Sequence, residues 1–157
     1  MALRQILKEG DPVLRKKSRP IEKIDDRLIT LIDDMRETLE KSGGVGLAAV
    51  QVGVLKRVVL VDNGEEVLEL INPVIVSKEG HQEEVEGCLS CPNVWGVTQR
   101  PMVVTVSAMN RNGEMKTYTG DGLTARCFCH ELDHLDGILF IDHAEILDED
   151  ELEEISE

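Results

Sequence analysis

An HExxH pattern at residues 130–134, set in an otherwise apolar helical segment, limits what this chain can fold into more than any other feature. The helix is predicted over residues 123–136, with Gly137 as a stop signal. His130 and His134 share one face of it and apolar side chains lie opposite, so we expect the helix to be buried. Burying two imidazoles and a carboxylate is costly unless they are paired or coordinated. The sequence therefore predicts a metal site in the core.

A catalytic tetrahedral ion needs a third protein ligand and one open position. Zinc proteases with an HExxHxxGxxH pattern use a third histidine, but this chain has Phe140 there, and phenylalanine cannot coordinate a metal. His81 and His143 stand alone in polar surroundings, which is typical of surface residues. Cys88 is the better candidate, because a thiolate suits Fe(II) and Zn. Two alternatives remain: a glutamate from the acidic C-terminus as third ligand, or hydrogen-bonded core histidines with no ion.

The sequence holds four cysteines: Cys88, Cys91, Cys127 and Cys129. In a small secreted protein they would suggest two disulfides. The first residues lack the basic-then-apolar layout of a secretory signal, so we expect a cytoplasmic protein with free thiols. The rival hypothesis is a structural zinc site formed by all four. It is disfavoured because the second pair has a single intervening residue and because it leaves the HExxH pattern unexplained.

The length of 157 residues predicts one domain. No apolar run approaches the ~20 residues of a membrane span. A net charge of −14 and an aromatic content of 3% argue against nucleic-acid binding. The acidity is concentrated in residues 145–157, where 8 of 13 side chains are carboxylates. We therefore expect a single domain at residues 1–144, followed by an acidic C-terminal tail at residues 145–157.

Apolar side chains recur every three or four positions over residues 25–41, which predicts an amphipathic N-terminal helix. An NRNG turn at residues 110–113 predicts a hairpin. Short β-branched segments separated by Gly, Asn and Pro predict strands at residues 57–62, 67–71, 74–77, 102–108 and 114–118. The predicted fold class is α+β, with mostly antiparallel sheets packed around a central HExxH-bearing helix.

Three separated motifs resemble those of the peptide deformylase family, whose members remove the N-terminal formyl group from newly made polypeptides. Residues 44–51 (GVGLAAVQ) are similar to the family's GxGxAAxQ segment, residues 86–90 (EGCLS) to its EGCxS segment, and residues 130–134 (HELDH) to its HExDH segment. The order and spacing of the motifs match as well. Three positions depart from the family pattern without removing a ligand or the base: Val50, Cys91 and Cys129.

The resemblance implies a hydrolase whose catalytic domain spans residues 1–144. It implies that one ion is bound by three side chains, with water in the fourth place: Cys88, His130 and His134. Glu131 would move the proton between water and the leaving amine, and the oxyanion would be stabilised by the Gln51 side chain and the Leu89 backbone N–H. Four further residues are implied to bind substrate: Val45 and Gly46 along its backbone, Arg100 beyond its first residue, and Cys127 in the methionine pocket.

The resemblance also implies Fe(II) as the native ion, while one cysteine and two histidines also accept Zn, Ni or Co. The implied partners are N-formylmethionyl nascent chains, with no membrane and no nucleic acid. Some similar proteins have a basic terminal helix that touches the ribosome, a contact that the acidic terminus here does not favour. Two other functions stay open: an HExxH metalloprotease, and a metal-stabilised binding domain without activity.

Overall fold

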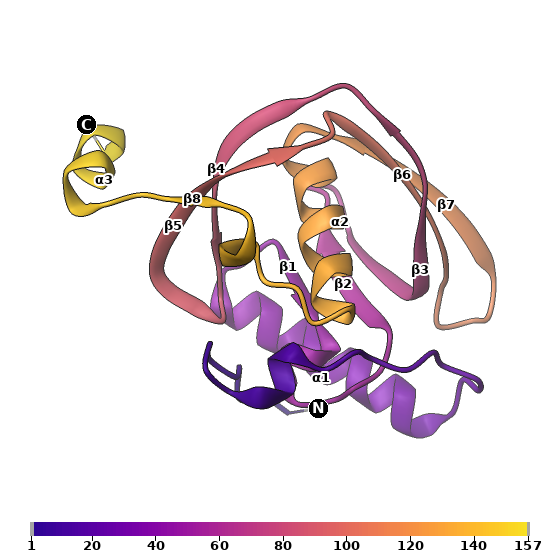
Figure 1. Cartoon of the computed structure of the whole chain (residues 1–157). Helices are drawn as coiled ribbons and strands as arrows, with labels where there is room; N and C mark the ends of the chain where they lie inside the picture. Colours follow the sequence, from indigo (N-terminus) through magenta and orange to yellow (C-terminus); the bar gives the residue numbers. More distant parts are fainter. Residues whose placement is uncertain (1, 157) are drawn as a thin grey trace.

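The computed structural model, which describes residues 2–156, has an α+β fold with two antiparallel sheets (Figure 1). The larger sheet has the strand order β1 (Gly46–Ala48), β2 (Val58–Asp62), β3 (Val67–Glu79), β6 (Val103–Met109) and β7 (Met115–Asp121). The smaller sheet has the order β4 (Gln82–Cys88), β5 (Cys91–Arg100) and β8 (Glu145–Ile146). The α-helices are α1 (Asp26–Ser42), α2 (Gly122–Leu135) and α3 (Glu149–Ser156), and short 3-10 helices are η1 (Pro12–Arg15), η2 (Ala49–Val52) and η3 (Phe140–Asp142). The α+β class with antiparallel sheets is confirmed.

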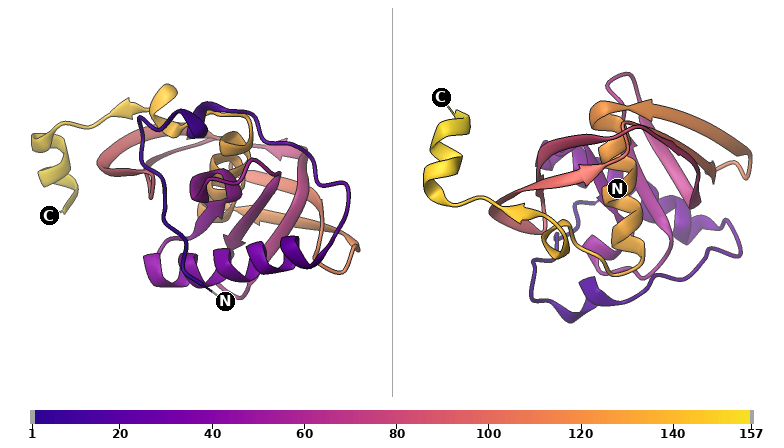
Figure 2. Two further views of the ribbon diagram at one scale, coloured as in Figure 1. Left: turned by 90° about the horizontal axis from the view of Figure 1, so that it is seen from below. Right: turned by 45° about the horizontal axis from the view of Figure 1, so that its top comes forward.

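The larger sheet is covered by a helix on each face, as the alternation along β2 demonstrates. Val59 and Val61 pack in one core cluster with side chains of α2, whereas Val58 and Leu60 pack in another with side chains of α1. Successive side chains of a strand point to opposite faces, so β2 is buried on both. Figure 1 shows α2 between the two sheets, and Figure 2 shows α1 beneath the larger one. The HExxH pattern thus lies in the interior.

Strand β3 differs from its predicted form, because the sequence pattern suggested two strands at residues 67–71 and 74–77. The structure has one strand with a register shift between Ile71 and Val74. Asn72 adopts a positive φ of 51°, which asparagine tolerates better than most residues. Its side chain also accepts from the Ile21 N–H and donates to the Ile21 carbonyl, both at 2.8 Å. The Asn therefore bends the strand and anchors the N-terminal arm, where the pattern indicated a break.

Gly137→Ala is expected to lower the free energy of unfolding by at least about 2 kcal/mol. Gly137 follows α2 with φ 76°, and a Cβ there would lie 2.4 Å from the Arg15 carbonyl oxygen. Gly43, which follows α1 with φ 72°, has nothing within 4 Å of an added Cβ. Gly43→Ala is therefore the matched control, since it carries the conformational cost without the collision. Urea unfolding of both variants measures the two effects. Equal shifts of their midpoints would mean that the Arg15 backbone moves aside with no loss of stability.

The acidic C-terminal segment begins on the smaller sheet and then leaves it. In β8, Glu145 pairs with Val97 and Ile146 pairs with Gly96 of strand β5. Helix α3 extends away from the rest of the molecule in both figures. The boundary that the sequence predicted between domain and tail, after residue 144, therefore lies just before β8, which still pairs with β5. Among residues 2–156, no helix has the length and apolar character needed to cross a membrane.

Candidate active site

Helix α2 and the end of strand β4 bring three potential metal ligands together. Cys88, His130 and His134 each offer one ligand atom, and these atoms all lie within 4.8 Å of one another. Cys88 Sγ is 3.4 Å from His134 Nε2. Ligand atoms around a tetrahedral ion with bonds of about 2.0–2.3 Å lie roughly 3.3–3.8 Å apart, so small side-chain adjustments would suffice. One thiol and two imidazoles in this arrangement fit a divalent transition metal.

The two other histidines are exposed, as the sequence suggested. His81 is exposed, and His143 Nε2 lies 3.7 Å from Asp133 Oδ2, outside the ligand cluster. The Phe140 ring stacks on the His130 ring, with centroids 5.9 Å apart. Phe140 therefore packs against a candidate ligand at the position where a third histidine would be needed in the HExxHxxGxxH proteases.

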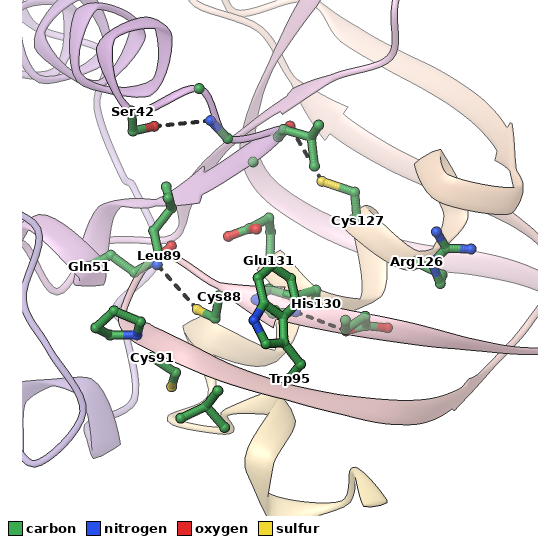
Figure 3. Close-up of a pocket in the computed structure, with 18 of the residues that line it drawn as sticks. Ser42, Gln51, Cys88, Leu89, Cys91, Trp95, Arg126, Cys127, His130 and Glu131 are labelled. Atoms are coloured by element: carbon green, nitrogen blue, oxygen red, sulfur yellow. Dashed lines mark hydrogen bonds and ion pairs between the residues drawn. The ribbon is translucent and has the colours of Figure 1, made fainter. Parts of the chain in front are cut away.

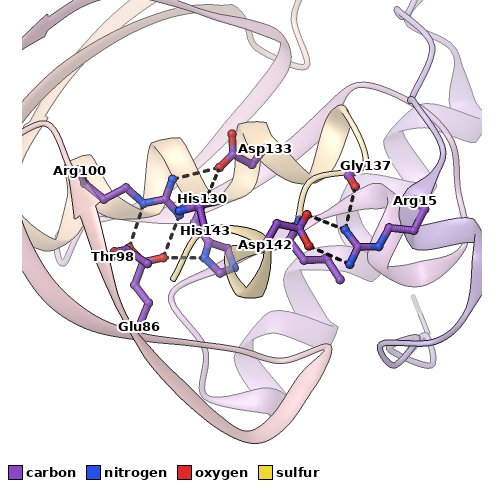
Figure 4. Close-up of polar contacts among 10 residues, drawn as sticks. Arg15, Glu86, Thr98, Arg100, His130, Asp133, Gly137, Asp142 and His143 are labelled. Atoms are coloured by element: carbon purple, nitrogen blue, oxygen red, sulfur yellow. Dashed lines mark hydrogen bonds and ion pairs between the residues drawn. The ribbon is translucent and has the colours of Figure 1, made fainter. Parts of the chain in front are cut away.

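The His130 ring is held by a buried carboxylate. Its Nδ1 lies 3.0 Å from Glu86 Oε1 (Figure 4). A hydrogen on Nδ1 leaves the Nε2 lone pair available to an ion. Burial opposes ionisation of Glu86, but hydrogen bonds from His130, Arg100 and Thr98 hold the pKa of this carboxyl well below its usual range. Glu86 is therefore an anion that fixes the orientation and tautomer of His130.

Arg100 lies beside Glu86. The resemblance implied that it meets the peptide beyond its first residue; its side chain is 6% exposed, and it is not among the residues that line the cavity described below. It donates to both Glu86 oxygens and to Asp133 Oδ2, each at 3.0 Å (Figure 4). A buried guanidinium requires carboxylate partners, and Arg100 has two. One of these partners, Glu86, is the residue that orients His130.

Glu131 lies in the interior next to the candidate ligands, and among the described residues its Oε1 has no hydrogen-bond partner. Burial raises the pKa of Glu131 to about 7. The backbone of Gly46 passes so close that an added Cβ would lie 2.6 Å from both Glu131 Oε2 and Cys127 Sγ. Glycine at position 46 therefore makes room for the carboxyl, which can gain or lose a proton near neutral pH.

Gln51 is fixed at the other side of Cys88. Its Oε1 accepts from the Ala48 N–H at 2.9 Å, and its Nε2 donates to Ser90 Oγ at 3.1 Å. The same Nε2 lies 3.7 Å from Cys88 Sγ (Figure 3). Leu89 follows Cys88 directly, and its carbonyl accepts from Lys8 Nζ at 3.2 Å. The Gln51 amide and the Leu89 backbone thus flank the candidate metal site.

A cavity of about 650 Å³ opens over this cluster (Figure 3). Val45 and Gly46 line one wall, and Cys127 lies beside them, with its Sγ 3.5 Å from the Val45 carbonyl oxygen. Trp95 lines the cavity too and lies against Gly87, where an added Cβ would be 2.4 Å from its ring. The cavity has the size of a small-molecule or peptide-end site.

The sequence predicted no role for several residues of the site. They are Ser90, Trp95, Thr98 and Asp133. Ser90 and Asp133 lie inside the EGCLS and HELDH motifs, so the motifs could have indicated a role for them. Thr98 and Trp95 lie in no motif. They reach Glu86 and Gly87 only because β5 pairs with β4.

Glu86→Gln is expected to weaken metal binding about 10- to 100-fold, the usual cost of losing a partner of a ligating histidine. The carboxamide cannot accept from both His130 and Arg100 as a carboxylate does, so the ring loses its fixed tautomer. Glu84→Gln, at an exposed position of the same strand, is the control. Competition titration with a chelator measures both variants, and equal affinities would mean that Glu86 does not position the ligand.

A family model described as polypeptide deformylase matches residues 3–150. The chain belongs to the peptide deformylase family. Peptide deformylase 2 of Clostridium acetobutylicum is 57% identical over 143 residues, which are 90% of this chain and 95% of that protein. The peptide deformylase of Caldanaerobacter subterraneus is 52% identical, over 100% of this chain and 99% of that protein.

Solved structures agree with this assignment. The crystal structure of peptide deformylase from Thermotoga maritima has a TM-score of 0.87 and 39% identity, over 90% of this chain and 97% of that one. The peptide deformylase from Synechococcus elongatus, solved in complex with actinonin, has a TM-score of 0.86 and 41% identity, over 95% of this chain and 81% of that one. Deformylases are metal-dependent hydrolases that remove the N-formyl group from nascent peptides, and neither the protease nor the inactive binding domain is favoured.

Proposed function

We propose that this deformylase works through one divalent ion held by Cys88, His130 and His134. The observation that carries the proposal is the convergence of their ligand atoms within 4.8 Å beside the cavity. Fe(II) is the proposed native ion, and Zn, Ni and Co suit the same donors. When bound, such an ion supplies Lewis acidity, which polarises a carbonyl and lowers the pKa of water toward neutrality.

Glu131 is the proposed proton carrier. Its carboxylate takes the proton of the attacking water and then donates it to the amine that leaves when the formamide bond breaks. Two observations support this role: within residues 2–156 no hydrogen-bond partner reaches Oε1 of this carboxyl, and burial raises its pKa to about 7. A group with this pKa can both accept and release a proton at neutral pH.

Gln51 and Leu89 are the proposed donors to the oxyanion that forms when the formyl carbon becomes tetrahedral. The Gln51 amide is supported by its contacts with Ala48 and Ser90, so it is oriented before substrate arrives. The Leu89 backbone N–H follows the proposed ligand Cys88 directly in the chain. Losing one such donor costs ~3 kcal/mol of transition-state stabilisation in other hydrolases.

Val45, Gly46 and Cys127 are the proposed substrate-binding residues. Strand β1, which begins at Gly46, stands at one end of the strand order, where a peptide can add as a further strand. Cys127 is a buried, apolar thiol in the cavity wall and suits the methionine side chain. For Arg100 we propose an indirect role: it keeps Glu86 ionised, and Glu86 orients His130.

We also infer that the catalytic domain comprises residues 1–144, with the sheets packed around α2 and with α1 as the amphipathic N-terminal helix. Residues 145–157 form an acidic tail, and the enzyme acts in the cytoplasm on N-formylmethionyl chains. Eight carboxylates in this tail would be repelled by ribosomal RNA, so we propose no ribosome contact through it. No membrane or direct nucleic-acid partner is proposed.

The function is tested with formyl-Met-Ala and an unformylated peptide, under anaerobic conditions with Fe(II) or Ni(II). The expected result is release of formate from the first peptide and no cleavage of the second. Cleavage of the unformylated peptide would favour a protease. Bound metal without reaction of either peptide would favour the inactive binding domain.

A further inference from the structure

The hairpin of β4 and β5 brings a second thiol next to the proposed metal ligand. Cys88 and Cys91 are paired across the two-residue turn between the strands. They pack in the same core cluster, with Leu139 and Phe140, and both line the cavity. Directly opposed residues of antiparallel strands have Cα atoms about 4.5–5.5 Å apart, with side chains on one face. This separation lies within the range that a disulfide spans, about 4.4–6.8 Å.

The proposed mechanism assigns no task to Cys91. It is not part of the candidate ligand cluster, and its side chain is 3% exposed. Cys88 is more accessible and faces the cavity (Figure 3). The other two cysteines lie on α2, and Cys127 contacts the Val45 carbonyl. Cys91 is therefore a buried thiol that the two-residue turn holds next to Cys88.

We propose that Cys91 is a resolving thiol for Cys88, so that oxidation of Cys88 by hydrogen peroxide ends in a disulfide. In the first step the Cys88 sulfur attacks peroxide, the O–O bond breaks, and a sulfenic acid and one water form. In the second step the Cys91 sulfur attacks the Cys88 sulfur, the S–OH bond breaks, and the hydroxyl leaves as water with the Cys91 proton. In total the two thiols lose two hydrogen atoms, and one peroxide becomes two waters.

The disulfide would protect the site from permanent damage. A sulfenic acid without a nearby thiol is oxidised further to sulfinic and sulfonic acids, which common thiol reductants do not reverse. A disulfide is reversed by a dithiol. If Cys88 is the metal ligand, as the proposed function states, disulfide formation also prevents the ion from binding, and reduction restores the site.

The test treats metal-free and Zn(II)-loaded protein with hydrogen peroxide, because Zn(II) does not itself react with peroxide. Free thiols are then blocked by alkylation, and the products are identified by intact mass and peptide mapping. Cys91→Val and Cys129→Ser are compared with the unchanged chain. We expect the unchanged chain and Cys129→Ser to lose two hydrogen atoms and to yield a peptide cross-linked between Cys88 and Cys91. We expect Cys91→Val to gain two or three oxygen atoms on Cys88. After reduction with dithiothreitol, this variant should bind at least about tenfold less metal than the unchanged chain treated in the same way.

Two outcomes would overturn the proposal. One is accumulation of sulfinic or sulfonic acid on Cys88 in the unchanged chain with no cross-link to Cys91. The other is a cross-link from Cys88 to Cys127 in place of Cys91. Both are read by peptide mapping of the unchanged chain, so they do not depend on whether the variant folds. A bound ion that fails to slow the oxidation would count against Cys88 as a ligand, which is a separate failure of the proposed function.

Discussion

Glu131→Gln is expected to retain its metal ion while kcat falls about 10²- to 10⁴-fold. The carboxamide has nearly the same shape as the carboxyl, so the ligand cluster beside it is preserved. It cannot take a proton from water or return one to the leaving amine. Metal content and formate release from formyl-Met-Ala measure the two effects on the same sample. Undiminished turnover would remove Glu131 from the proton-transfer role.

The same variant should be more stable than the unchanged chain when both are metal-free and the pH is above 7. Burial raises the pKa of Glu131 to about 7 from 4.5, so the folded state resists ionisation that the unfolded chain undergoes freely. Below pH 4.5 the carboxyl is protonated in both states and costs nothing. The destabilisation grows as the pH rises through this interval and is complete above 7. At about 1.4 kcal/mol per pKa unit, Gln should gain about 1–3 kcal/mol there.

Thermal unfolding at pH 4.5 and pH 8 checks this expectation. A gain of this size corresponds to about 2–4 °C in Tm per kcal/mol for a chain of this length, and it should be present at pH 8 and absent at pH 4.5. Glu84→Gln makes the same chemical change at an exposed position and should leave the Tm unchanged at both pH values. A gain of equal size at both pH values would mean that the effect comes from packing and not from the buried charge.

The sequence predicted the elements that depend on local periodicity. The helix expected at residues 25–41 is observed at Asp26–Ser42, and the hairpin at the NRNG turn joins β6 to β7. The pattern failed at Asn72, where a strand continues through a positive φ. This bend depends on hydrogen bonds with Ile21, which is 51 residues away, and local propensity does not report such a contact.

The candidate site was predictable to the extent that its residues stand in motifs. The two histidines are one helical turn apart, so spacing alone places them together, whereas Cys88 was joined to them by choosing among possible ligands and by the family resemblance. The resemblance places Arg100 near the substrate, and nothing in the local sequence indicates the partners that it has in the fold. Its contacts with Glu86 and Asp133 require the β4–β5 pairing and the packing of α2 against it. The residues that support the ligands are therefore the part that the structure adds.

Cys88→Ser is expected to weaken metal binding more than about 100-fold, and to reduce turnover in proportion to the metal lost. Removing only an outer partner of a ligating residue costs about 10- to 100-fold, and here the ligand itself is changed from a thiolate to a neutral hydroxyl. The two imidazoles alone would hold the ion loosely. Metal content after dialysis, and the thiolate-to-metal absorption of the Co(II) form, report the loss without relying on activity.

Cys129→Ser is the matched control, because it makes the same change at another buried cysteine that lies outside the ligand cluster. It should retain the ion and the Co(II) absorption band. Unchanged metal content in Cys88→Ser would remove Cys88 from the ligand set and direct the search to His143, which would then have to leave Asp133. We expect Cys88→Ser to lose the ion because Cys88 Sγ lies 3.4 Å from His134 Nε2, and two ligands of one tetrahedral ion lie roughly that far apart.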